Sequence, residues 1–462
     1  MKLPIYYVGT PAEVEHHAQP LAADFDVRIE GAESVVDRAR PGDVCIFYNE
    51  FFSRYRWAIH SLLEKGCATL YALDGIFEWR SLWEFPPGMS CLWSVRPVLS
   101  HKVACVGRSQ ARLLESWGNA SQSEIVGVPR FDQLIGRAAR ARSSSEPFRI
   151  LVLTAKAPGF TPQQFNNCVH SLRDLKSWLD EHSTINDVSI EAVWRLTPGL
   201  ESLVGVENSL KDTTGKELAE TLAGVDAMIT TPSTAMLEGM LQQIPVALLD
   251  YNNCPHYVPA AWSITAANHL DQVVPELMAS TPAKLLYQQH LLYDALECQS
   301  PAQPRLSELI VRMHEWAKRC RAVGQPISFP AQMLRRSSAE LPACWARPNS
   351  AQLFPENQTF ADRDLLRLQA QMPDLHEALA AATRDNILLK RKLSGAERSL
   401  HQLIADAGGA HLVWRWLQSA AQGKVRRWQI VSKCFMRKHS GETRGSAHPS
   451  ISGPELAQNQ SE

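Results

Sequence analysis

The hydrophobic and polar positions of the chain predict two successive sets of buried strands separated by helices. Short apolar runs alternate with segments of helical length from residue 3 onward. Apolar runs of about four to eight residues in such an alternation are typical of parallel strands covered by helices. In the first set, the predicted strands are Leu3–Val8 and residues 43–48, 68–73, 102–106 and 124–128, and the predicted helices are residues 56–65 and 109–117.

A second set follows the basic, serine-rich residues 137–147, which are predicted to form a hinge. The pattern therefore predicts an α/β protein with two Rossmann-like domains that face a central cleft, at residues 1–140 and 147–322. In the second set, the predicted strands are Phe148–Leu153, residues 188–196, Ala227–Thr230 and Val246–Leu249, and the predicted helices are residues 163–180, 215–223, 282–297 and 306–321, the last two closing this domain.

The stretch 227–250 is predicted to form a strand, a tight loop, a helix and a strand, with the candidate ligand-binding residues in the loop. Thr231, Ser233 and Thr234 supply hydroxyls where the helix should begin, and Pro232 suits a first helical turn. A helix that begins beyond the carboxyl end of a parallel strand presents N–H groups and the positive end of its dipole to an anion. Phosphate is the anion predicted to bind there.

The same predicted helix runs to Gln243 and carries Glu238 one turn inside its start. A carboxylate in that place can accept hydrogen bonds from the vicinal hydroxyls of a ribose. The stretch thus favours a nucleotide diphosphate as ligand. The alternative is that Ser233 and Thr234 only cap the helix and that Glu238 is a surface charge.

A linker at residues 323–360 precedes a predicted coiled coil at residues 361–407. Pro373 suits a first helical turn, and Asn386 at a buried seam position favours a parallel dimer in one register. A homodimer is therefore expected, and the alternative is a helix packed on its own globular body. The seam consists of Met372, Leu375, Leu379, Ala382, Asn386, Leu389, Leu393, Ala396, Leu400 and Leu403.

Residues 408–438 combine tryptophan and other apolar residues with lysine and arginine at helical spacing. This composition is typical of an interfacial membrane helix, so peripheral contact with the inner face of a membrane is predicted. A partner-binding helix or simple packing would have a similar pattern. The polar tail, residues 439–462, is predicted to be disordered.

Composition narrows the function classes. The chain has 462 residues, 45% of them hydrophobic, and a net charge of −1, so nothing points to nucleic acid as a partner. The ten cysteines form no Cys-x-x-Cys pair and no cluster with metal-ligand spacing. A secretory leader and a run of about 18 apolar residues are also lacking, so a cytoplasmic location is expected. No cofactor or metal is predicted.

Three motifs carry a family resemblance: DGIFEWR at residues 74–80, GVPRFDQL at residues 127–134, and TTPSTAMLEGMLQQIPVALLDY at residues 230–251. Their order and spacing resemble bacterial surface-polysaccharide biosynthesis proteins of the two-Rossmann glycosyltransferase B (GT-B) type. These are relatives of CDP-glycerol glycerophosphotransferases and UDP-N-acetylglucosamine 2-epimerases. The resemblance spans residues 3–321. It implies a nucleotide-activated sugar or alditol donor held by the C-terminal domain and a glycan or lipid-linked acceptor approached from the N-terminal one.

The catalytic base is predicted at the carboxyl end of the strand 68–73. Asp74 follows that strand and is the first choice for a general base, and Glu78 is the second. The glycerophosphotransferases that this chain resembles use a His-Gly pair at the comparable place. This chain has Asp74-Gly75 there instead. The alternative role of Asp74 is to cap the following turn.

Cationic residues near the predicted cleft are candidates for binding phosphate. Lys156 can pair with a donor phosphate as a point charge, and Arg195 can form a bidentate contact. Arg130 is either a phosphate contact or, as the sequence favours, an ion pair with Asp132. Thr197 stands where the resemblance implies a histidine, so proton transfer from that position is lost.

His256 is a candidate acceptor contact, although a lone histidine is more often structural. Two Asp-x-Asp matches, at residues 24–26 and 362–364, lie outside the predicted donor domain and are poor candidates for a diphosphate-bound metal. A cytoplasmic transferase of surface glycan assembly is therefore the leading hypothesis. The alternatives are a non-catalytic scaffold dimerised by its coiled coil, and a sugar-nucleotide epimerase.

Overall fold

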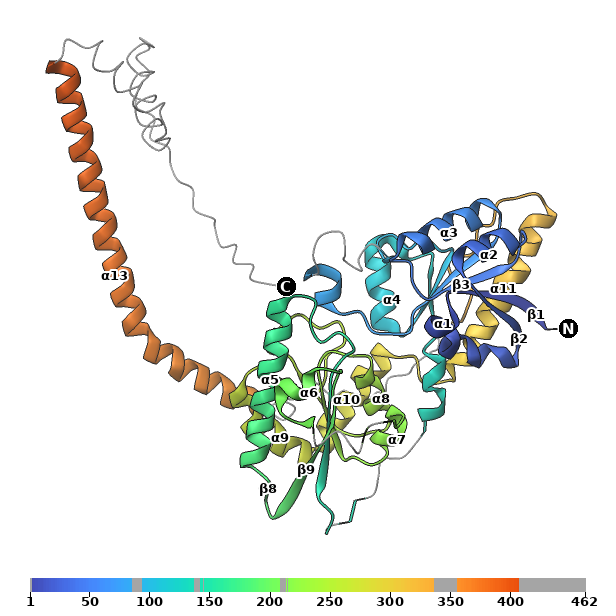
Figure 1. The fold of residues 1–462 in the computed structure, drawn as a ribbon, viewed down its shortest axis with the longest axis horizontal. Helices are drawn as coiled ribbons and strands as arrows, with labels where there is room; N and C mark the ends of the chain where they lie inside the picture. The colour runs from blue at the N-terminus through green and yellow to red at the C-terminus, as the bar shows by residue number, and fades with distance from the viewer. Residues whose placement is uncertain are drawn as a thin grey trace, which may run out of the picture. The chain divides into compact units, whose positions relative to one another are not determined.

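The computed structural model describes residues 2–84, 94–136, 142–143, 145–207, 213, 215–335 and 355–406. It divides into two units, Met1–Asp362 and Arg363–Glu462. The first unit contains two parallel α/β sheets and their helices, which we call the N-terminal half and the C-terminal half (Figure 1). The basic aromatic segment 408–438 and the tail 439–462 lie outside the described residues, as do most of the hinge and residues 336–354 of the linker.

The N-terminal half is built on a six-stranded sheet in the order β2-β1-β3-β4-β5-β6, with every pair parallel. Both faces are buried because neighbouring side chains of one strand enter different cores, as Tyr7 and Val8 of β1 do. The strands are β1 Leu3–Val8, β2 Phe25–Glu30, β3 Val44–Phe47, β4 Ala68–Ala72, β5 Lys102–Cys105 and β6 Ser123–Ile125, and the helices are α1 Pro11–Ala18, α2 Ala32–Arg38, α3 Ser53–Glu64 and α4 Arg108–Leu114.

The C-terminal half has the sheet order β12-β11-β10-β7-β9-β8, which is parallel except for the β8–β9 hairpin. Met228 and Ile229 of β10 enter different cores, so helices cover both faces here too. The strands are β7 Phe148–Leu153, β8 Thr184–Ile185, β9 Val188–Arg195, β10 Ala227–Thr230, β11 Val246–Leu249 and β12 Trp262–Ile264, and the helices are α5 Pro162–Glu181, α6 Leu200–Val204, α7 Leu218–Leu222, α8 Ala235–Leu241, α9 Leu270–Met278 and α10 Pro282–Ala295.

The two sheets share one topology. Leaving out the short hairpin strand β8, each half places its second strand on one side of its first strand and the remaining strands on the other. The order therefore reverses between β1 and β3 in one half and between β7 and β10 in the other. In open α/β sheets, ligands bind beyond the carboxyl ends of the strands at such a reversal. The predicted two-Rossmann α/β architecture is confirmed.

Helix α11, Ala302–Ala322, corrects one prediction. It was expected to close the C-terminal half, but its buried residues pack against strands β1, β3 and β4 of the N-terminal half (Figure 1). Asp132 fixes its start by accepting hydrogen bonds from the backbone N–H groups of Ala302 and Gln303, at 2.7 and 2.8 Å. Asp132 is thus a helix cap and not the ion-pair partner predicted for Arg130.

The first part of the predicted linker, up to residue 335, packs against the N-terminal half. Glu124 accepts hydrogen bonds from the backbone N–H groups of Met333 and Leu334, and the buried ammonium of Lys102 pairs with Glu124 at 2.9 Å. The same ammonium donates to the carbonyls of Pro330 and Ala331. The segment up to residue 335 is therefore tied to the edge of the N-terminal sheet.

Besides the two-residue hairpin strand β8, the sequence pattern did not predict the strands β2 and β12. β2 alternates apolar and charged residues at the sheet edge, so it lacks the continuous apolar run of the central strands. β12 has only three residues, Trp262–Ile264, with Ser263 exposed. Both lie at sheet edges, where one side of the strand has no neighbour and the apolar signal is weakest.

The described residues of the second unit belong to one long helix, α13, Pro355–Asp406. It begins inside the predicted linker and passes through Pro373, which is therefore not in a first helical turn. Leu379 and Leu389 of the predicted seam are 65% exposed in the single chain. Among the helices that the structure describes, none is long and apolar enough to cross a membrane.

Candidate functional site

One arginine connects two carboxylates from different halves at the carboxyl ends of the sheets. Arg130 lies in the turn Pro129–Leu134 of the N-terminal half and contacts Asp74, just after β4, with its Nε 3.2 Å from Oδ1. Its terminal nitrogen also donates to Glu238 Oε1 of α8, in the C-terminal half, at 2.8 Å. Arg130 thus forms ion pairs with Asp74 and Glu238 instead of the predicted one with Asp132, and it joins two residues that were predicted to have different roles.

The imidazole of His17 lies on the other side of Asp74. His17 is near the end of α1, and its Nδ1 is 3.5 Å from Asp74 Oδ2. Burial lowers the pKa of His17 below its usual value, and the positive charges of Arg130 and Lys156 act in the same direction, although Asp74 opposes them. His17 is therefore neutral at neutral pH. A neutral imidazole beside a carboxylate can accept a proton from a substrate.

His16, His17 and Asp74 also form a group of potential metal ligands whose atoms lie within 4.8 Å of one another. Arg130 contacts Asp74 directly, and the charge of Lys156 reaches His17. Two neighbouring cations disfavour a divalent ion there, because like charges repel strongly in a partly buried site. The arrangement fits proton transfer or an anion better than a metal.

The predicted phosphate-binding helix differs from expectation. α8 has seven residues and begins at Ala235, so the hydroxyl residues before it form a loop rather than a first helical turn. The first N–H groups are not available to a ligand, since those of Ala235 and Met236 donate to Ser233 and that of Leu237 donates to Thr234. The N–H groups of Ala235, Met236 and Leu237 are therefore paired within the protein, contrary to the expectation for this helix start. The side chains around it are what remain for binding.

The loop before α8 contacts the other half. The hydroxyl of Thr234 accepts a hydrogen bond from the backbone N–H of Ile76 at 3.1 Å. Gly75 is needed there, because a Cβ on it would lie 2.8 Å from that hydroxyl. Asp74 is thus carried on a turn that packs directly against the start of α8.

Threonine hydroxyls hold the loop that follows β7. Thr231 accepts from the N–H of Ala155 at 2.9 Å, and Thr197 donates to the carbonyl of Ala155 at 2.5 Å. Thr197 therefore has a structural role where the resemblance implies a histidine. Lys156, next in the loop, is exposed, and its charge acts on His17 across the two halves.

Arg195 lies at the end of β9, on the same edge of the sheet. It donates to the carbonyl of Lys216 at 2.8 Å, and its charge contributes to the environment of Glu238. Burial raises the pKa of Glu238, while Arg130 opposes that rise. Arg130 and Arg195 thus bring positive charge to Glu238, and Lys156 brings positive charge to His17.

Glu78 and His256 belong to a second interdomain cluster. Glu78 is paired with the buried guanidinium of Arg80, which also donates to the carbonyl of Pro158 in the other half. His256 Nε2 lies 3.4 Å from the buried Asp250. Burial lowers the pKa of His256, as does the charge of Arg80, although Asp250 opposes them. Both histidine and glutamate are therefore occupied by protein partners.

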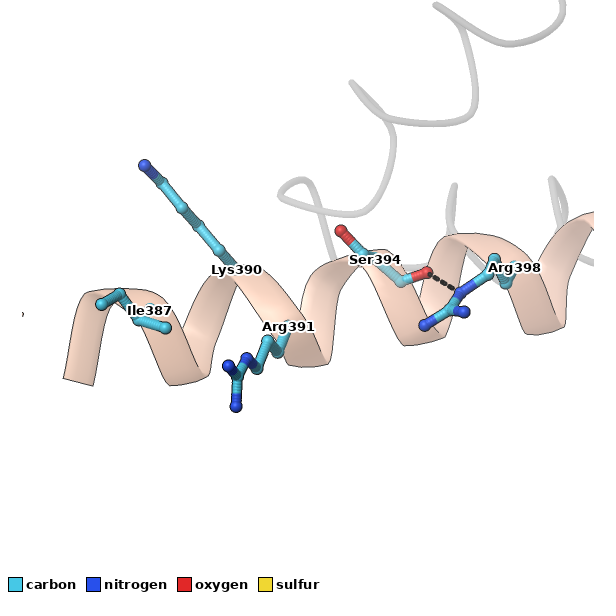
Figure 2. Close-up of a pocket in the computed structure, with 5 residues that line it drawn as sticks. All are labelled: Ile387, Lys390, Arg391, Ser394 and Arg398. Carbon is cyan, nitrogen blue, oxygen red and sulfur yellow. Dashed lines mark hydrogen bonds between the residues drawn. The ribbon is translucent and has the colours of Figure 1, made fainter. Parts of the chain in front are cut away.

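Hydrogen bonds join the two halves at three places, through Arg130 to Glu238, Ile76 to Thr234 and Arg80 to Pro158. A hollow of about 10 Å³, roughly room for one water, is lined by Ile76 and Tyr257 among other residues, close to the turn that carries Asp74. The larger hollow, about 260 Å³, lies along α13 and is lined by Ile387, Lys390, Arg391, Ser394 and Arg398, as Figure 2 shows. A single helix lines it, so it offers no enclosed binding site.

Comparisons with known proteins give structural similarity only. No protein-family model and no curated protein matches the sequence. A protein assigned as a UDP-N-acetylglucosamine 2-epimerase of Listeria monocytogenes is similar, with a TM-score of 0.46, 11% identity and coverage of 68% of this chain and 97% of that one. The wall teichoic acid polymerase TagF, in a structure with CDPG, has a TM-score of 0.43, 12% identity and coverage of 68% and 89%.

The lipopolysaccharide outer core galactosyltransferase WaaB is also similar, with a TM-score of 0.40, 10% identity and coverage of 67% of this chain and 99% of that one. Similarity at these TM-scores and identities does not indicate the activity of this chain. The architecture rests on the two strand orders, and the site rests on its own contacts.

His17 is the site residue that the sequence analysis missed. A signal was present, because His16 and His17 follow the first strand and lie on the first helix, beside the reversal of strand order. A histidine pair on a helix does not show which element it faces. Only the fold placed His17 beside Asp74.

Proposed function

We propose that this protein is a GT-B-type transferase of bacterial surface-polysaccharide assembly. Its donor would be a nucleotide-diphosphate-linked sugar or alditol, and its acceptor a hydroxyl of a glycan or lipid-linked chain. The observation that carries the proposal is the convergence of Asp74 and Glu238, from the two halves, on the guanidinium of Arg130. Convergent titratable groups where the carboxyl ends of two parallel sheets meet are typical of an active site in this class of fold.

The donor would bind on the C-terminal half. Lys156 and Arg195 supply positive charge for the diphosphate, and the hydroxyls of Thr231, Ser233 and Thr234 line the loop beside it. Glu238 would accept hydrogen bonds from the ribose once Arg130 releases it. Arg130 would then turn to a phosphate, which exchanges one charge-assisted contact for another.

The acceptor would lose its proton to Asp74 and His17. Asp74 holds the Nδ1 side of the neutral imidazole, which leaves Nε2 as the proton acceptor. The acceptor oxygen forms the new bond, the bond to the departing nucleotide breaks, and the nearby cations stabilise the charge that the nucleotide carries away. Glu78 is the second choice of base and would first have to leave Arg80. His256 would contact the acceptor only after separating from Asp250.

Donor binding at Glu238 requires its contact with Arg130 of the other half to break, since that contact occupies the carboxylate. Calorimetric titration with a panel of nucleoside diphosphates tests the proposal. Binding of one of them, weakened by Lys156→Ala, supports it. Silence across the whole panel would overturn the transferase assignment.

A second candidate is a non-catalytic scaffold of the same fold. The observation in its favour is that the carboxylates of Asp74 and Glu238 are both occupied by Arg130, while Thr197 takes the place of a histidine. A scaffold would keep this bridge permanently. Nucleotide binding without turnover of any activated donor would favour it.

We propose further that the chain is cytoplasmic and forms a homodimer through α13. The support for the dimer is the exposed apolar seam of that helix. Peripheral contact with a membrane through residues 408–438 remains part of the proposal, and these residues lie outside the described structure. Deleting residues 361–462 should abolish dimerisation while nucleotide binding remains.

A further inference from the structure

The apolar seam of α13 is bordered by charges that have no counterpart on their own helix. Repeating the seam letters a and d from Met372 and Leu375 places Asp385 and Lys392 at g positions, and Lys390 and Glu397 at e positions. Ion pairs within one helix join residues three or four positions apart. The neighbours of Asp385 at those distances are Ala381, Ala382, Leu388 and Leu389, and those of Lys390 are Asn386, Ile387, Leu393 and Ser394.

Lys392 has the same kind of surroundings, with only leucine, glycine and alanine three and four positions away. Figure 2 shows the side chain of Lys390 extended away from the helix, on a different side from Arg391. Leu389 and Leu393, which lie between these charges on the seam, are 65% and 49% exposed. The pattern is that of a surface whose partner is another chain.

We propose that α13 pairs with a second copy of itself in parallel and in register. In a parallel two-stranded coiled coil, a g residue lies beside the e residue five positions later on the other helix. Asp385 then meets Lys390 of the second copy, and Lys392 meets Glu397 of the second copy. By symmetry, each contact occurs twice. All four contacts join opposite charges.

Asn386 fits the same arrangement. It lies at an a position midway along the seam, so the two copies of Asn386 meet and can hydrogen-bond to each other. In an antiparallel pairing, g residues would lie beside g residues and e residues beside e residues. The contacts of Asp385 with Lys390 and of Lys392 with Glu397 between the two copies would then be lost. Ile387 and Leu388 are also exposed, but they lie outside the seam. This inference rests on the proposed dimer and not on the transferase chemistry.

Charge exchange on the full chain tests the orientation. Sedimentation equilibrium should show a dimer for the unaltered protein. Lys390→Glu places like charges beside Asp385 twice per dimer, so the dissociation constant should rise about tenfold. Asp385→Lys should have the same effect. The double variant with both changes restores opposite charges only in the parallel register, so its dissociation constant should return to within about twofold of the original.

Arg391→Glu is the matched control. It makes the same change of charge one residue away at an f position, which faces outward in the proposed dimer. Its dissociation constant should stay within about twofold of the original. A monomeric unaltered protein at tens of micromolar would overturn the dimer and the inference together, while the nucleotide titration stands separately.

A dimer whose double variant is no tighter than the single variants would overturn the parallel register alone. A trimer or tetramer of the unaltered protein would overturn the two-stranded arrangement. Rescue by the double variant, with the control unchanged, is the expected result.

Discussion

Arg130 of the N-terminal half donates a hydrogen bond to Glu238 of the C-terminal half at 2.8 Å. Glu238 is 8% exposed, so its carboxylate needs a partner, and Arg130 is that partner in this structure. The same guanidinium holds Asp74. Any ligand that requires either carboxylate must therefore compete with a contact between the two halves, which couples ligand binding to their separation.

Removing the bridge should destabilise the protein. Arg130→Ala leaves the carboxylate of Glu238 buried without its cation, so we expect the free energy of unfolding to fall by about 1–3 kcal/mol. The loss is smaller than for a fully buried ion pair because the side chain of Arg130 is one-third exposed. Urea denaturation at pH 7 measures this. Arg112→Ala is the matched control, since Arg112 also joins the halves, to Asp294, but in an exposed pair. Its loss should cost at most about 1 kcal/mol. Equal losses for both variants would contradict a special role for Arg130.

Asp74→Asn should reduce turnover far more than nucleotide affinity. Asparagine keeps the size of the side chain but cannot hold an imidazolium by charge, so turnover of the donor identified in the nucleotide panel should fall by about 100-fold or more. Nucleotide affinity should stay within about threefold, because the donor is proposed to contact the other half. Steady-state kinetics and calorimetry measure the two quantities. Unchanged turnover would remove Asp74 from the mechanism.

Two half-buried histidines predict loss of stability in acid. Burial lowers the pKa of His17, and it lowers that of His101 to about 4. The unfolded chain then binds protons more readily than the folded one as the pH falls below about 6.5, so stability decreases with falling pH. Denaturation at pH 7.5 and pH 5.5 should show this decrease, and His17→Asn and His101→Asn should each reduce it.

Activity separates these two histidines. If His17 accepts the proton of the acceptor, His17→Asn abolishes the fall of kcat/KM on the acid side of the pH profile along with most of the activity. His101 lies between Thr69 and Phe329, with its Nδ1 accepting from the Thr69 N–H at 3.2 Å, outside the proposed site. His101→Asn should therefore change stability and leave the pH profile of activity unchanged. Similar profiles for both variants would contradict the role of His17.

Lys156 and Arg195 should differ in their structural effects while sharing an effect on binding. Each replacement by alanine should weaken nucleotide binding about tenfold, since a charge-assisted contact contributes roughly 1.5–3 kcal/mol. Lys156→Ala should leave the unfolding midpoint unchanged, because its side chain is exposed. Arg195→Ala should lower it, because Arg195 donates to the carbonyl of Lys216. Unweakened binding in both variants would place the diphosphate elsewhere.

The sequence by itself determined the two α/β halves and the central strands. Residues Leu3–Val8, Phe148–Leu153, Ala227–Thr230 and Val246–Leu249 were predicted with the bounds that the structure gives. These strands have neighbours on both faces of the sheet, so the requirement for apolar side chains acts on most of their residues and leaves a nearly continuous local signal. The heptad seam of α13 is local in the same way.

Tertiary structure alone decided which partners the site residues have. Arg130 lies two positions from Asp132 in sequence, yet it pairs with Asp74 and Glu238, while Asp132 caps α11. The start of α8 depends likewise on Ile76, which is 158 residues away from Thr234. A charged or hydroxyl side chain can satisfy its hydrogen bonds with many partners, and only the packing of the two halves selects one of them.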